Sequence, residues 1–139
     1  MTGQSIKQIE RAVGAYVGAR YASAVEVGIG RNTTAAETAE AAGCRVRAVD
    51  IRPCETGSVP FALDDVFAPD LALYRGAEVI YAVRPGVEMV PPLGALARCC
   101  ACDLLVYHLG NEIYLEGGER IASGGVVLHR YCRGLSEEG

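Results

Sequence analysis

Short apolar runs alternate with helix-forming segments along most of this chain, and this alternation constrains the fold more than any other feature. Apolar runs with the length of buried strands are expected at 24–27, 45–49, 62–66, 78–83 and 103–109. Helices are expected at 6–17, from Thr34 to Gly43, at 69–74 and up to about Cys100. Strands that alternate with helices need crossover connections, which predicts a mostly parallel sheet with helices on both faces.

The pattern changes after Gly110. Residues 113–115 and 124–130 are short strand-like segments, and the glycine pairs 117–118 and 124–125 lie close to them. Such spacing is typical of antiparallel strands. With a length of 139 residues, we expect one domain spanning 1–139. The fold class predicted is α/β: a Rossmann-like three-layer α/β/α sandwich, with about six strands and an antiparallel C-terminal edge.

The most informative motif is Glu26-Val27-Gly28-Ile29-Gly30-Arg31-Asn32, which follows the first predicted strand. Two glycines allow a tight turn and a close approach of backbone to ligand. Thr34 and Glu37 match a capping box, so a helix start is expected there, with free N–H groups that favour an anion. Asp50 ends the next strand about 20 residues later, where a carboxylate can accept ribose hydroxyls.

The type of ligand is only partly constrained by this motif. A tight strand-to-helix turn and a solvated acid would explain the same residues structurally. However, the strand, the helix cap and Asp50 occur together at the expected spacing, which favours a nucleotide-type ligand. The dinucleotide-binding fingerprint has a third glycine at the position where this chain has Thr33. That substitution weakens the case for NAD.

Glu26-x-Gly28-x-Gly30 followed by Asp50 resembles the first two motifs of class I S-adenosylmethionine-dependent methyltransferases, over residues 22 to 109. A broader resemblance, over nearly the whole chain, is to a family of small uncharacterised archaeal proteins with a Rossmann-like, methyltransferase-like fold. It rests on the segments Val25–Asn32, Val49–Pro53, Asp64–Phe67 and Ile80–Pro85.

The resemblance implies a cofactor, S-adenosylmethionine, and a set of contacts. Glu26, Gly28 and Gly30 would line its methionine end, with Asn32 closing the same turn. Asp50 would hold the ribose. Either Asp64 or Asp65 would lie near the adenine, although this acidic pair also fits a turn or a helix cap.

Arg84 is the candidate substrate contact, because it follows the predicted strand 78–83 at the presumed site. An ion pair with Glu88 is the alternative. The segment Tyr81–Gly86 lacks the Asp/Asn-Pro-Pro-aromatic motif of many amino-methylating enzymes. Roughly 30 residues follow Leu109, too few for a usual substrate-recognition insertion. The acceptor is therefore expected to be small, or held by a second subunit of a homo-oligomer.

Charge and hydropathy exclude other classes of function. The net charge is -4, which argues against nucleic-acid binding, although Arg45, Arg47 and Arg52 could form a small basic patch. Apolar stretches stay well below the ~18 residues of a membrane span. Charges interrupt the first residues, so no secretory signal is expected. A cytoplasmic protein with a small-molecule partner is predicted.

The six cysteines are expected to be reduced thiols. Cys99 and Cys102, with His129 and Cys132, have spacings that can chelate zinc. Small apolar fillers explain the cysteines more simply, so no metal is predicted. His108 is expected to be a core histidine.

Three functions stay open. The leading one is binding of S-adenosylmethionine, with methyl transfer to an unknown acceptor. The second is a non-catalytic nucleotide-binding or regulatory module. The third, an NAD(P)-binding oxidoreductase, is disfavoured by Thr33.

Overall fold

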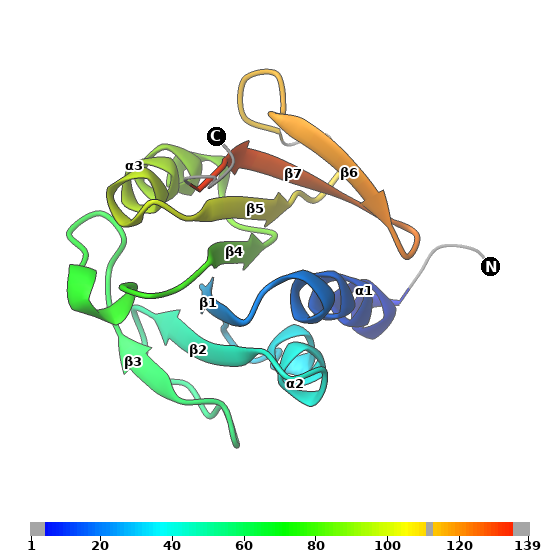
Figure 1. The fold of residues 1–139 in the computed structure, drawn as a ribbon, viewed down its shortest axis with the longest axis horizontal. Coiled ribbons are helices and arrows are strands. Elements are labelled where there is room, and N and C mark those ends of the chain that lie inside the picture. The colour runs from blue at the N-terminus through cyan, green and yellow to red at the C-terminus, as the bar shows by residue number, and fades with distance from the viewer. Residues whose placement is uncertain (1–4, 111–112, 135–139) are drawn as a thin grey trace.

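The computed structural model describes residues 5–110 and 113–134, and within these ranges seven strands form one sheet (Figure 1). The strands are β1 (Ser23–Val27), β2 (Arg45–Asp50), β3 (Phe61–Leu63), β4 (Val79–Val83), β5 (Asp103–Tyr107), β6 (Glu119–Ser123) and β7 (Val126–Cys132). Their order is β3-β2-β1-β4-β5-β7-β6. The first five run parallel, and β7 pairs antiparallel with both β5 and β6. The predicted parallel sheet with an antiparallel C-terminal edge is confirmed.

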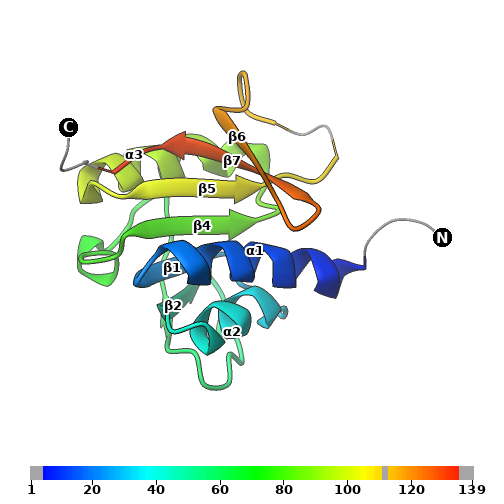
Figure 2. The same ribbon diagram turned by 45° about the vertical axis from the view of Figure 1, so that its right-hand side comes forward.

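Helices cover both faces of the sheet, which gives the three predicted layers (Figure 2). On one face lie α1 (Ile6–Arg20) and α2 (Thr34–Ala41), and on the other lies α3 (Val90–Cys100). All five residues of β1 are buried, because a central parallel strand is covered on both sides. None of the described helices is both long and apolar enough to cross a bilayer.

Two glycines let α1 and α2 pack closely. A Cβ built on Gly14 would lie 2.3 Å from the Ala35 carbonyl oxygen, and one on Gly18 would lie 2.7 Å from the Ala42 Cβ. Real Cβ atoms do not approach so closely, so only glycine permits this helix contact at either position. The close packing fixes α1 against the length of α2, from Ala35 near its start to Ala42 at its end.

Several local predictions need correction. Thr33, and not Thr34, is the N-cap of α2, and its hydroxyl donates to the Glu37 carboxylate (2.9 Å) without capping a backbone N–H. The Asn32 side chain supplies that bond instead, since its Oδ1 accepts from the Thr34 N–H (3.1 Å).

One predicted helix is shorter than expected, and one predicted strand does not form. The helix predicted at 69–74 is a single 3-10 turn, η1 (Leu71–Leu73), which follows Pro69 and Asp70. Residues 113–115 form no strand. The hairpin β6–β7 instead turns at Gly124 and Gly125, whose φ angles of 60° and 87° suit a tight hairpin turn.

Candidate functional site

The chain changes direction across the sheet between β1 and β4. From β1 it proceeds to β2 and β3 on one side, then crosses back to β4 and β5 on the other. At such a switch point the loops diverge, and ligands bind outside the carboxyl ends of the strands. The loop after β1 is the glycine-rich turn, so the structure brings the motif to this edge.

Gly28 and Gly30 adopt φ angles of 76° and 56°, a region that favours glycine. The turn is tied to β2: the Gly28 N–H donates to the Val49 carbonyl (2.7 Å), and the Gly30 N–H donates to Asp50 Oδ2 (2.9 Å). A Cβ added to either glycine would meet nothing within 4 Å. The space in front of the turn is therefore open, as close approach of a ligand requires.

Two cavities open at this edge. One, of about 770 Å³, is lined by Gly30, Arg31 and residues 50–55. The other, of about 390 Å³, is lined by Val27, Gly28, Asp50, Ile51, Asp64, Asp65, Val66, Phe67, Glu88 and Met89. Asp50 and Ile51 belong to both linings, so the two cavities adjoin at the end of β2.

The acids of the smaller cavity differ in how far the protein already uses them. Both Asp64 oxygens accept bonds, from the Tyr74 hydroxyl (2.6 Å) and from the Asp70 N–H (3.0 Å). Among the described residues, the Asp65 carboxylate accepts only from the Phe67 N–H (2.9 Å), through Oδ1. Asp65 thus has the freer carboxylate of the pair, and Asp64 holds the loop.

The N–H groups at the start of α2, predicted to be free, are in part already bonded. Asn32 caps the Thr34 N–H, and the Glu10 carboxylate of α1 lies near the Ala35 N–H. Burial raises the pKa of Glu10, while Arg84 and the Ala35 N–H partly oppose this rise. The Thr34 N–H is therefore already bonded within the protein.

Glu26 lies in the core, and its side chain lines neither cavity. Its Oε1 accepts from the hydroxyl of buried Tyr81 (2.9 Å). Burial raises the pKa of Glu26 to about 8, with a further contribution from the nearby Glu10 carboxylate. Glu26 therefore joins β1 to β4 within the core.

Arg84 follows β4 with a φ of 54°, an unusual conformation for a non-glycine residue. Its Nη2 donates to Glu10 Oε2 (2.9 Å), so the ion pair is with Glu10 and not with Glu88. Sequence reasoning missed Glu10, although one signal was present. Position 10 lies on the apolar stripe of α1 with Ile6 and Val13, and a charge there must be paired.

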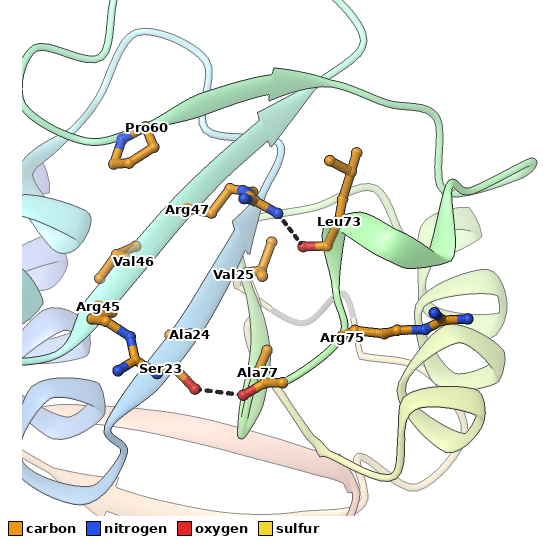
Figure 3. Close-up of a pocket in the computed structure, with 11 residues that line it drawn as sticks. Ser23, Ala24, Val25, Arg45, Val46, Arg47, Pro60, Leu73, Arg75 and Ala77 are labelled. Carbon is orange, nitrogen blue, oxygen red and sulfur yellow. Dashed lines mark hydrogen bonds between the residues drawn. The ribbon is translucent and has the colours of Figure 1, made fainter.

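A third cavity, of about 300 Å³, lies at the opposite edge of the sheet, near the amino ends of β1 and β2 (Figure 3). Arg45 and Arg47 line it, and Arg47 Nη1 donates to the Leu73 carbonyl (2.7 Å). Arg52 lines the 770 Å³ cavity instead. The three arginines that are close in sequence therefore do not form one patch.

The candidate zinc ligands are also separated. Cys132 pairs with Leu104 at the start of β5, whereas His129 pairs with Val106 near its end. His129 lies beside His108, with ring centroids 5.1 Å apart. No three metal-binding side chains come together in the described ranges. His108 is buried and bonded through Nε2 to the Tyr131 hydroxyl (2.7 Å), as a core histidine would be.

The sequence matches a family. The model of the uncharacterised protein family UPF0146 matches residues 7–128. The UPF0146 protein of Halobacterium salinarum is 34% identical over 119 residues, covering 81% of this chain and 90% of that protein. The UPF0146 protein of Pyrococcus horikoshii is 29% identical over 112 residues, covering 77% and 86%.

Solved structures show the same fold at low identity. A S-adenosyl-L-methionine methyl transferase from Silicibacter pomeroyi aligns with a TM-score of 0.58 and 18% identity, covering 95% of this chain and 100% of that chain. The sugar N-methyltransferase KedS8 from Streptoalloteichus aligns with a TM-score of 0.51 and 15% identity, covering 84% of this chain but only 54% of that chain. The fold is therefore methyltransferase-like.

Proposed function

This protein belongs to the UPF0146 family, and we propose that it binds S-adenosylmethionine and transfers the methyl group to a small acceptor. The observation that carries the proposal is an acidic cavity at the carboxyl ends of the strands, joined to a glycine-rich turn with open space before it. The shared fold of two solved methyltransferases supports it.

Charge favours this cofactor over nucleotides that carry phosphate. Asp50, Asp65 and Glu88 all line the smaller cavity, and carboxylates repel phosphate while accepting bonds from hydroxyl and amino groups. S-adenosylmethionine carries a ribose and a sulfonium cation but no phosphate. A dinucleotide would instead place its pyrophosphate at the start of a helix, where Asn32 and Glu10 already lie.

The contacts proposed for the cofactor follow from this charge distribution. Gly28 and Gly30 would border the sulfonium end. Both Asp50 oxygens already accept from backbone N–H groups, of Gly30 and Arg52, and Asp50 would accept the ribose hydroxyls through its remaining lone pairs. Asp65 would accept from the adenine amino group, while Val66 and Met89 give the ring an apolar wall. Glu26, Asn32 and Asp64 would act from behind by holding the loops in place.

The bound cofactor supplies an electrophilic methyl group. The protein then needs to orient an electron-rich acceptor in line with that methyl and to exclude water. Arg84, at the end of β4, remains the candidate residue for contact with the acceptor.

Calorimetry with S-adenosylhomocysteine, S-adenosylmethionine, NAD and ADP tests the proposal. We expect the two sulfur compounds to bind, and at 100 times the dissociation constant each should stabilise the fold by about 2.7 kcal/mol. Binding of NAD or ADP with no response to the sulfur compounds would refute it.

A transfer assay separates an enzyme from a non-catalytic module. The protein is incubated with methyl-tritiated S-adenosylmethionine and a metabolite extract of low molecular mass. We expect label in small organic products with wild-type protein, and much less with an Asp50→Ala variant. Tight cofactor binding without labelled product would favour the regulatory module.

A further inference from the structure

The ion pair between Glu10 and Arg84 joins the first helix to the candidate site. Glu10 lies on α1, which runs across the face of the sheet above β1 and β4 (Figure 2). Its side chain is only 2% exposed, whereas that of Arg84 is 23% exposed. The guanidinium can therefore be reached from the solvent at the carboxyl end of β4, while the carboxylate lies behind it.

Within residues 5–110 and 113–134, hydrogen-bonding groups of both members of this pair have no partner. Glu10 Oε1 is buried and has no partner among the described residues. Arg84 makes its bond to Glu10 through Nη2, so other N–H groups of the planar fork are available to a second carboxylate. A buried acceptor without a donor is unfavourable, so such an atom calls for a binding partner.

The backbone at Arg84 carries a second sign of function. Its φ of 54° is unfavourable for a side chain with a Cβ, and such residues cluster at ligand sites. The Arg84 N–H donates to the Tyr107 carbonyl at the end of β5 (2.7 Å). Arg84 thus combines an unfavourable backbone conformation with a side chain that is ion-paired to Glu10.

The chemistry of the pair defines its ligand. Free guanidinium N–H groups bind a carboxylate, often through two parallel bonds. A free carboxylate oxygen next to them accepts from an ammonium group. A molecule with a carboxylate and an ammonium on adjacent atoms is an α-amino acid. The neighbouring Glu26 is already bonded to Tyr81, which leaves Glu10 as the acceptor for that ammonium.

We propose that Glu10 and Arg84 form a recognition site for an α-amino-acid group, with Arg84 binding its carboxylate and Glu10 Oε1 its ammonium. The group has two sources: the amino-acid end of the cofactor, in which case the inference rests on the proposed function, or a free amino acid that serves as acceptor.

Calorimetry tests whether the group is the amino-acid end of the cofactor. S-adenosylhomocysteine and 5′-methylthioadenosine share the nucleoside thioether, but only the former carries the amino-acid group. For Arg84→Gly, which suits the left-handed backbone, we expect a loss of tenfold or more in affinity for S-adenosylhomocysteine. The affinity for methylthioadenosine should change less than twofold. Glu10→Gln should show the same selectivity with a smaller loss.

The second source is tested on the same proteins with free L-methionine and L-glutamate, followed by calorimetry with and without saturating methylthioadenosine. We expect binding to the wild type and its loss in Arg84→Gly if the site takes a separate amino acid. Arg11→Met, an exposed arginine of the same helix, is the matched control and should behave as wild type in both arms. Circular dichroism and urea unfolding establish that each variant folds.

Equal loss of affinity for both nucleosides in Arg84→Gly, together with no response to free amino acids, would overturn the inference. So would unchanged binding of every probe. If wild-type protein binds neither nucleoside but does bind free amino acids, the proposed cofactor is wrong and the recognition site stands.

Discussion

Replacing Glu26 with glutamine should make the protein more stable at alkaline pH and should leave it nearly unchanged at acidic pH. The carboxyl group is 2% exposed, and its Oε1 accepts from the Tyr81 hydroxyl at 2.9 Å. A glutamine has the same shape and retains an oxygen for that bond. It differs from glutamate in having no charge to bury.

The magnitude follows from the pKa of Glu26. Burial raises this pKa from 4.5 to about 8, so the folded state holds a proton that the unfolded chain releases. The contribution to stability is complete below pH 4.5, falls as the pH rises towards 8, and is constant above that. Since each pKa unit corresponds to about 1.36 kcal/mol, the loss is on the order of 5 kcal/mol.

Urea unfolding between pH 4.5 and 9 measures this effect as the difference between the two proteins. Glu10 interacts with Glu26 and its own pKa is also raised, so the difference curve reports the Glu26 charge together with its effect on Glu10. Glu116→Gln, at an exposed position, is the matched control and should give a nearly constant difference. If Glu26→Gln also gives a constant difference across this range, Glu26 is ionised in the folded state and the reasoning fails.

Three further predictions concern the turn and the helix pair. Asp50→Ala should weaken S-adenosylhomocysteine binding by about 1.5–3 kcal/mol in calorimetry, because hydrogen bonds to a charged group are lost; unchanged affinity would make Asp50 only an anchor for the turn. Gly28→Val should abolish binding by filling the open space, whereas Gly43→Val, equally strained but remote from the site, should still bind; equal behaviour of the two would move the site elsewhere. Gly14→Ala should lower the urea midpoint by an amount equivalent to about 1–3 kcal/mol, since its Cβ would meet the Ala35 carbonyl; a stable variant would show that α1 shifts without loss.

The layered fold was predictable because its central strands can be recognised from their local sequence. β1 and β4 are short apolar runs, and the structure buries nearly every residue in them. The position of the glycine-rich turn followed from the same alternation, since a loop after the first parallel strand must emerge at the carboxyl edge. These features depend on residues that are close in sequence.

The contacts within the site were less predictable because they join distant residues. The Glu10–Arg84 pair spans 74 positions, and the Tyr81–Glu26 bond spans 55. Local sequence patterns do not show which residues this far apart in the chain come into contact. The register of β7 was not predictable for a similar reason: His129 pairs with Val106, and a bulge separates that part of the ladder from the pairing of Leu104. A strand pattern has a period of two residues and does not specify register across a bulge.

The carboxylates around the turn explain why one motif can suit a nucleoside better than a nucleotide. In a dinucleotide site the free N–H groups at the helix start bind the pyrophosphate. Here Asn32 caps one of these groups, and Glu10 lies near another. Glycines alone therefore do not select a ligand, because they only make room for it. The groups at the helix start determine which charge that space accepts, and under the proposed function Asn32 and Glu10 would determine it in this chain.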